Sequence, residues 1–218
     1  MAKQEKPHSA EYFGEQRDFW WNSDFVALMA GRWRLSEART ILDAGCGLGH
    51  WGRVLAPFLS PEAVVTGVDR EPEWVLKAAE IAKARGLTRF GYRQGDANGL
   101  PFADAAFDLV TCQTLLIHVP DPRTTLREFL RVLKPGGLLV LSEPNNLANS
   151  LVRDSENFNG DISVLTAAVR LQALCERGKA ALGLGNNSIG DLLPALLHEA
   201  GLLDLQAYLS DKATLTLP

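Results

Sequence analysis

The chain has 218 residues, of which 46% are hydrophobic and 22% are charged, and its formal net charge is -4. This length suits one domain with an insertion, and the composition excludes a disordered chain. A protein that binds nucleic acid usually has an excess of basic residues to neutralise phosphates, and this chain is acidic. We therefore expect no bulk nucleic acid as a partner. A small molecule or a protein fits better as the substrate, and the oligomeric state stays open.

The cysteine content and the apolar runs help to predict the cellular compartment. The chain has three cysteines, an odd number without the spacing of a disulfide framework or a zinc site. The N-terminus has no apolar core of a secretory signal, and no apolar run approaches the roughly 18 residues of a membrane helix. We therefore expect a cytoplasmic protein with no metal site and no membrane partner.

The first expected element is helical. Residues 11–34 are rich in aromatic side chains at helical spacing and are typical of one or two helices. We assign 1–35 to an N-terminal helical cover over a ligand pocket.

The next region, 36–146, alternates short apolar runs with longer helical patterns, as βαβ units with a parallel sheet do. A helix opened by Asp121 and Pro122 is expected to end at Pro135-Gly136-Gly137. The pattern predicts an α/β fold, a Rossmann-like three-layer sandwich with a mostly parallel sheet and helices on both faces. The expected strands are 40–44, 63–68, 90–93, 107–112 and 137–142.

The C-terminal third is expected to leave the sheet and then return to it. Residues 147–200 are mostly helical in pattern and form an insertion that caps the pocket. Residues 201–218 are expected to complete the sheet with a strand at 202–209. The alternation at 213–217 is weak, which indicates an edge strand that is cut short, so the final strand is expected to be truncated.

The segment with the most chemical content follows the first expected strand and reads Asp43-Ala44-Gly45-Cys46-Gly47-Leu48-Gly49. Glycine lets the backbone approach a ligand closely. Gly47, Gly49 and Gly52 also match the spacing of a dinucleotide-binding turn, in which a helix N-terminus takes a diphosphate. The glycines alone therefore leave two cofactor classes open, beside a plain tight turn with no ligand.

The motif Asp43-x-Gly45-x-Gly47-x-Gly49 resembles the first motif of class I S-adenosylmethionine-dependent methyltransferases. In that family the loop lies under the methionine part of the cofactor, whose ammonium is positive. An acid is favourable there and unfavourable beside a diphosphate. The resemblance implies S-adenosyl-L-methionine as the cofactor, with Asp43, Gly45, Cys46, Gly47 and Gly49 in its site.

Two further segments carry the resemblance. Asp69 ends the second expected strand, where a carboxylate can accept hydrogen bonds from two ribose hydroxyls; capping the helix that starts at Pro72 is the alternative. We include the adjacent Arg70 in the cofactor site. The resemblance implies that Asp96 accepts from the adenine amine while the Ala97 N–H donates to a ring nitrogen. The alternative for this pair is a polar surface turn.

Methyl transfer is an in-line displacement, so the enzyme mainly positions two partners and removes water. Ligands of open α/β sheets bind beyond the carboxyl ends of the strands, which points to Gln113, His118 and Glu143. We assign Gln113 to the cofactor site. His118 is the first candidate for a catalytic base, with packing or a hydrogen bond to the cofactor as alternatives. Glu143 is the second candidate, with a cap or a salt bridge as its alternative.

The N-terminal cover supplies two more candidates. Arg17 could pair with the methionine carboxylate, and Tyr12 could close over the sulfonium in a cation–π contact. Aromatic residues at helical spacing usually pack, so packing is the alternative for both.

The resemblance covers about 41–145 and implies a methyltransferase that acts on a small molecule. Residues 113–116 read Gln-Thr-Leu-Leu and lack the Asn/Asp-Pro-Pro-aromatic motif of amino-directed nucleic-acid methyltransferases. An NAD(P)-dependent oxidoreductase is the alternative that uses the same glycines and Asp69, but it does not account for Asp43 or Asp96. A non-catalytic subunit that binds S-adenosylmethionine is a third possibility, because no decisive base is evident. The acceptor stays open.

Overall fold

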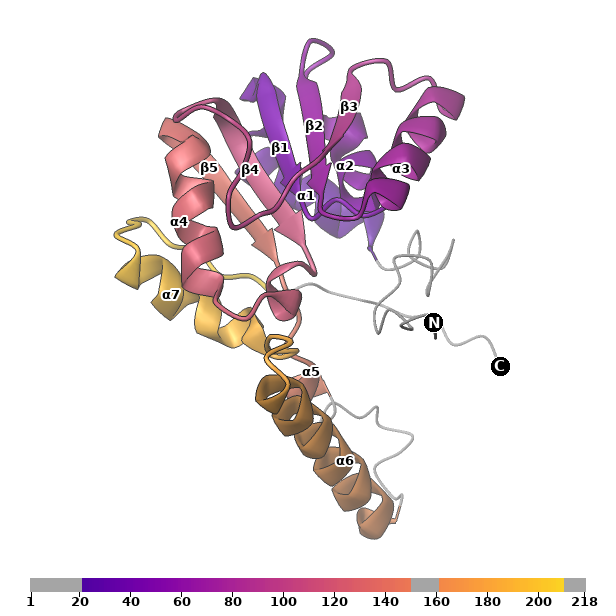
Figure 1. Ribbon diagram of the computed structural model, residues 1–218, viewed down its shortest axis with the longest axis vertical. Coiled ribbons are helices and arrows are strands. Elements are labelled where there is room, and N and C mark those ends of the chain that lie inside the picture. Colours follow the sequence, from indigo (N-terminus) through magenta and orange to yellow (C-terminus); the bar gives the residue numbers. More distant parts are fainter. Residues whose placement is uncertain (1–20, 150–160, 210–218) are drawn as a thin grey trace, which may run out of the picture.

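The computed structural model describes residues 21–149 and 161–209. Its centre is a parallel sheet with the strand order β3-β2-β1-β4-β5 (Figure 1). The predicted α/β class and the parallel sheet are confirmed. The strands are β1 (Thr40–Ala44), β2 (Val64–Asp69), β3 (Phe90–Gln94), β4 (Phe107–Gln113) and β5 (Leu133–Ser142).

The strand order places a switch point at the middle of the sheet. The chain leaves β1 toward β2 on one side and later returns to β4 on the other. Ala44 pairs with Val68 on β2 and with Cys112 on β4, so the carboxyl ends of these strands meet at one edge. Ligands of open α/β sheets bind beyond that edge, where the strand order reverses.

Helices cover both faces of the sheet, which confirms the predicted sandwich. In Figure 1, α4 lies on the near side of the sheet and α1 and α2 lie on the far side. One hydrophobic cluster joins α1 and α2 to β1, β2, β4 and β5, and the other joins α4 and α7 to β1 and β4. The α-helices are α1 (Ser23–Arg32), α2 (His50–Leu55), α3 (Pro72–Ala84), α4 (Pro122–Val132), α5 (Asn146–Asn149), α6 (Ile162–Ala181) and α7 (Leu193–Glu199).

Helix α4 begins as predicted but ends early. Asp121 accepts a hydrogen bond from the Arg123 N–H as N-cap, and Pro122 takes the first helical position. The helix ends at Val132, because Leu133 already pairs with Phe107 of the neighbouring strand. The expected stop at Pro135-Gly136-Gly137 was therefore wrong, and β5 is longer than the predicted 137–142.

The predicted strand at 202–209 was also wrong, because these residues form no strand. Leu203 is 79% exposed and Leu209 is 95% exposed, so neither side chain buries apolar surface that would stabilise a strand here. Asp204 has a φ of 56°, which interrupts an extended backbone. The strand expected at 213–217 lies outside the described residues.

Helices were predicted in an N-terminal region, 11–34, and in an insertion, 147–200. Within 11–34, the described part contains α1, so the helix is confirmed there. Tyr12 and Arg17 lie outside the described residues, and their roles stay predictions. Within 147–200, the described part is mostly helical, as expected.

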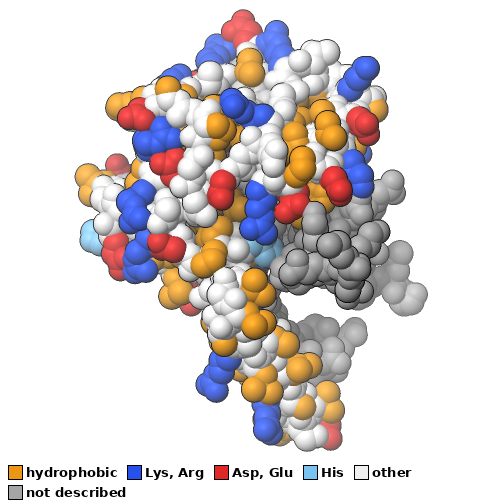
Figure 2. Space-filling model, in the orientation of Figure 1, with side chains coloured by type: hydrophobic (Ala, Val, Ile, Leu, Met, Phe, Trp, Pro, Cys, Tyr) orange, Lys and Arg blue, Asp and Glu red, His pale blue; other side chains and the backbone are white. Residues whose placement is uncertain are grey.

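Helix α6 extends away from the sheet (Figure 1), and hydrophobic side chains lie along its surface (Figure 2). Its exposed apolar side chains are Ile162, Val164, Leu171 and Leu174. Among the helices that the structure describes, none combines the length and the hydropathy of a membrane span.

Candidate cofactor site

The glycine loop between β1 and α2 forms a tight turn at the switch point. Gly45, Gly47 and Gly49 have φ angles of 64°, 50° and 73°, which only glycine adopts at low cost. The Cys46 N–H donates to the carbonyl of Val68 on β2 at 3.0 Å, and the Gly49 N–H donates to the Cys46 carbonyl at 2.7 Å. These bonds hold the loop over the carboxyl ends of β1 and β2.

Gly45 is also tightly enclosed. A Cβ there would lie 2.9 Å from Cγ of Leu115, closer than side chains tolerate. We expect Gly45→Ala to lower the free energy of unfolding by about 1–3 kcal/mol, because the positive φ and the overlap add. Urea denaturation measures this change. Gly86→Ala is the control, since Gly86 has a φ of 69° but open space around it; equal losses in both variants would show that the overlap with Leu115 costs nothing.

Asp43 lies beneath the loop and is 1% exposed. Its Oδ2 accepts a hydrogen bond from the Gly52 N–H at 3.1 Å, and its Oδ1 is buried with no hydrogen-bond partner among the described residues. Burial raises the pKa of Asp43 to about 7. A buried acceptor without a partner is costly, so this oxygen fits a ligand that brings a positive charge or a donor.

Tyr92 is a residue that the sequence analysis missed. It extends from β3 toward the loop, where a Cβ at Gly49 would overlap the tyrosine hydroxyl. This hydroxyl is buried and has no hydrogen-bond partner among the described residues, and burial raises the pKa of Tyr92. Tyr92 therefore sets the space that the loop can occupy.

Asp69 joins the end of β2 to the glycine loop. Its Oδ2 accepts a hydrogen bond from the Gly47 N–H at 2.9 Å, and its Oδ1 accepts one from the Glu71 N–H at 3.0 Å. The N-cap position of α3 is Glu71, so the cap role considered for Asp69 was wrong. Each carboxylate oxygen can accept a second bond, which leaves capacity for ribose hydroxyls. Burial raises the pKa of Asp69.

The turn after β3 lies beside Asp69. The Gly95 N–H donates to the Asp69 carbonyl at 3.0 Å. Asp96 accepts a hydrogen bond from the Asn98 N–H at 2.8 Å, so it forms the polar turn that was its alternative interpretation. Its adenine contact and that of the half-buried Ala97 stay predictions. Arg70 is exposed beside the same edge and lies 3.7 Å from the Glu71 carboxylate.

The end of β4 leads into a short 3-10 helix, η4 (Leu116–His118), which contains the candidate base His118. Gln113 is buried and pairs with Ser142 at the carboxyl edge, and its contact with the cofactor stays a prediction. His118 is half-buried, and its backbone N–H donates to the Leu115 carbonyl at 2.8 Å. Its role as a base stays a prediction.

Glu143 follows β5 and binds the backbone around η4. Its Oε1 accepts hydrogen bonds from the N–H groups of Leu115 at 2.8 Å and Leu116 at 2.9 Å. Its Oε2 accepts from the Ile117 N–H at 3.2 Å. Burial raises the pKa of Glu143 to about 7. These bonds give the carboxylate a structural role, and its catalytic role stays a prediction.

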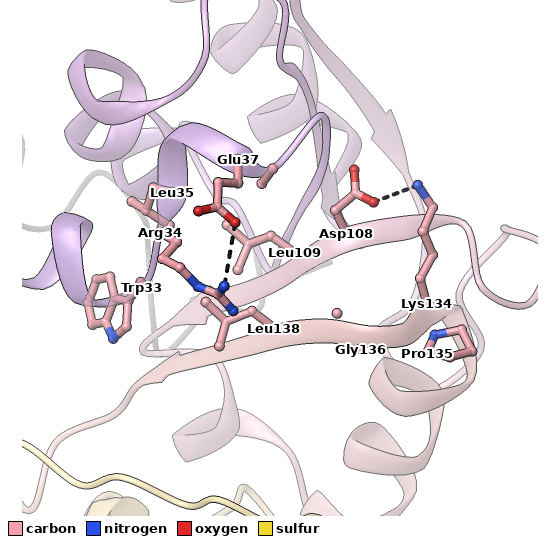
Figure 3. Close-up of a pocket in the computed structure, with 12 residues that line it drawn as sticks. Trp33, Arg34, Leu35, Glu37, Asp108, Leu109, Lys134, Pro135, Gly136 and Leu138 are labelled. Atoms are coloured by element: carbon pink, nitrogen blue, oxygen red, sulfur yellow. Dashed lines mark hydrogen bonds and ion pairs between the residues drawn. The ribbon is translucent and has the colours of Figure 1, made fainter.

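The cavity in Figure 3 lies at the opposite edge of the sheet and has a volume of about 220 Å³. An ion pair of 2.7 Å between Lys134 and Asp108 borders it at the amino ends of β4 and β5. The hydrogen bond from Lys134 lowers the pKa of Asp108. None of the predicted site residues lines this cavity, and the location of the cofactor site at the carboxyl edge stays a prediction. In the described part of the chain, no group of His, Cys, Asp or Glu could hold a metal.

Residues 35–201 match the model of a family described as "Methyltransferase domain". The chain is 36% identical over 128 residues to the demethylmenaquinone methyltransferase of Geobacillus kaustophilus, covering 59% of this chain and 53% of that protein. It is 34% identical over 133 residues to the uncharacterized methyltransferase YcgJ of Bacillus subtilis, covering 61% of this chain and 51% of that protein. The chain thus spans about half the length of these curated relatives.

Solved structures share the fold. The crystal structure of YcgJ superposes with a TM-score of 0.51 at 30% identity and covers 60% of this chain and 58% of that chain. A SAM-dependent methyltransferase from Aquifex aeolicus superposes with a TM-score of 0.59 at 20% identity, covering 85% of this chain and 82% of that chain. The second similarity shows the fold alone, and the predicted Rossmann-like architecture is confirmed.

Proposed function

Because the chain belongs to the methyltransferase domain family, we propose that it binds S-adenosyl-L-methionine and transfers the methyl group to a small-molecule acceptor. The observation that carries the proposal is the arrangement of Asp43, the three-glycine turn and Asp69 at the switch point of the sheet. It provides two buried carboxylates beside backbone that can approach a ligand closely.

The residues fit this cofactor. Asp69 would accept hydrogen bonds from the ribose hydroxyls, and the buried Oδ1 of Asp43 lies where a positive ammonium would be stabilised. Asp96 and the Ala97 N–H would recognise the adenine ring. When bound, the cofactor supplies an electrophilic methyl group on a sulfonium.

The chain's own residues position the acceptor and exclude water from it. The segment from Leu115 to His118 follows β4 at the carboxyl edge, and Glu143 fixes its backbone. We assign His118 as the base that takes the acceptor proton on a ring nitrogen. The three free cysteines support a reducing cytoplasm as the compartment.

The first test is an acceptor screen that measures release of S-adenosylhomocysteine. Several of the matched relatives are named demethylmenaquinone methyltransferases, so reduced demethylmenaquinone is the first probe. Turnover that His118→Ala lowers by about 100-fold would support the proposal. Cofactor binding without turnover on any acceptor would favour the non-catalytic subunit, and consumption of NADH would favour the oxidoreductase.

The pH dependence of cofactor binding tests the role of Asp43. The pKa of Asp43 is about 7 in the free protein, and an ammonium beside it favours the ionised form. Affinity for S-adenosylhomocysteine should therefore rise roughly tenfold from pH 6 to pH 8 and level off above that. Titration calorimetry at each pH measures the rise. Asp43→Asn should bind with no such dependence, and an unchanged slope in that variant would remove Asp43 from the ammonium site.

A further inference from the structure

A buried lysine connects the outlying helix α6 to the site. Lys179 lies near the end of α6 and is 7% exposed. Its Nζ donates to the backbone carbonyl of Ile117 in η4 at 2.8 Å and to Oδ1 of Asn187. Burial lowers the pKa of Lys179, while Glu176 and Glu143 oppose that change. A buried ammonium is costly without partners, so its bond to one particular backbone carbonyl calls for an explanation.

Ile117 is bound by a second charged side chain, that of Glu143. The Ile117 N–H donates to Oε2 of Glu143 at 3.2 Å, while the Ile117 carbonyl accepts from Lys179. A carboxylate at the end of β5 and an ammonium at the end of α6 therefore fix η4 between them. Hydrogen bonds to charged groups are stronger than neutral ones, so this pair defines the position of the turn.

Two glycines let the segment after α6 approach this region closely. A Cβ at Gly185 would overlap the carbonyl of Ile117, and a Cβ at Gly190 would lie 2.6 Å from the carbonyl oxygen of Glu143. The Gly190 N–H also donates to the Pro144 carbonyl at 3.0 Å. The segment that follows α6 thus packs directly on both η4 and the turn after β5.

The contacts continue from η4 to the glycine loop. Glu143 holds the N–H of Leu115, and the Leu115 side chain occupies the space that a Cβ at Gly45 would need. The contacts run from Lys179 through Ile117, Glu143 and Leu115 to Gly45. Any shift of η4 would therefore change the floor of the cofactor loop as well as the place of His118.

We propose that Lys179 is a positioning residue, which holds η4 so that Leu115 supports the glycine loop and His118 faces the acceptor. This rests on the proposed function. The helical insertion is then a part of the site, because α6 supplies one of the two charged groups that fix η4.

Three variants test the proposal. Lys179→Met keeps an unbranched apolar side chain but removes the terminal ammonium, and Lys179→Arg restores a charged donor. Lys134→Met is the matched control, because it breaks the ion pair with Asp108 at the opposite edge of the sheet. The measurements are calorimetric affinity for S-adenosylhomocysteine and amide hydrogen exchange of Leu115, Leu116 and Ile117.

We expect Lys179→Met to weaken S-adenosylhomocysteine binding about tenfold and to speed exchange of the three amides by a similar factor. Lys179→Arg should recover most of both, and Lys134→Met should lower thermal stability without changing either. Unchanged affinity and exchange in Lys179→Met would overturn the proposal. If the unaltered protein fails to bind S-adenosylhomocysteine, the proposed function fails, while the exchange data still decide whether Lys179 holds η4.

Discussion

Asp69→Ala should weaken binding of S-adenosylhomocysteine by about 100-fold or more, because it removes two contributions together. The carboxylate is the expected partner of the ribose hydroxyls, and it also holds the Gly47 N–H of the glycine loop. Losing it leaves the cofactor without its ribose acceptor and leaves the Gly47 N–H without a partner, while the bond from the Cys46 N–H to the Val68 carbonyl still links the loop to β2. Titration calorimetry measures the loss.

Two further variants separate these contributions. Asp69→Asn keeps one acceptor oxygen for the Gly47 N–H but loses the charge, so we expect an intermediate affinity. Asp104→Ala removes an exposed carboxylate that pairs with Arg131 away from the loop, and it should bind as the unaltered protein does. Full affinity in Asp69→Ala would show that the ribose lies elsewhere.

The second large effect is expected at Glu143. Glu143→Ala removes the acceptors of three backbone N–H groups, those of Leu115, Leu116 and Ile117. We expect the free energy of unfolding to fall by about 3 kcal/mol, because buried donors then lack partners. Urea denaturation at constant pH measures this loss. A change below about 0.5 kcal/mol would mean that water replaces the carboxylate freely.

Ionisation of Glu143 should lower the free energy of unfolding as the pH rises. The pKa of Glu143 is raised from 4.5 to about 7 by burial, so the folded protein holds this proton more tightly than the unfolded chain. The resulting stability is fully present below pH 4.5 and is lost as the pH rises through 7. The unaltered protein should therefore lose about 3 kcal/mol relative to Glu143→Gln across that window. A constant difference between the two proteins would contradict the raised pKa.

Local sequence signals predicted the sheet and the glycine loop. Gly45, Gly47 and Gly49 mark positions where the backbone needs a positive φ, and such a requirement is visible in sequence because few other residues meet it. Asp43 and Asp69 could be placed because each ends or nearly ends an apolar run. Once the strands are parallel, their carboxyl ends share one edge, so these carboxylates had to meet there.

Other features depend on contacts that no local pattern encodes. Lys179 is one of several charged residues in the insertion, and only the packing of α6 against η4, 62 residues away in sequence, shows that it is buried. Glu143 was a candidate base with a cap or a salt bridge as its alternative, and no local pattern shows that its oxygens accept from backbone N–H groups. Residues 202–209 contain enough leucine for a strand, but they form none. Whether such a segment pairs with a neighbouring strand depends on tertiary contacts, which its local pattern does not encode.

Titration calorimetry of the unaltered protein with S-adenosylhomocysteine, with NAD as the comparison ligand, tests the central claim most directly. The arrangement of Asp43, Asp69 and the glycine loop predicts a micromolar dissociation constant for S-adenosylhomocysteine and no measurable heat with NAD. Binding of NAD, or no binding of either ligand, would contradict the assignment of this edge of the sheet as a methyl-donor site.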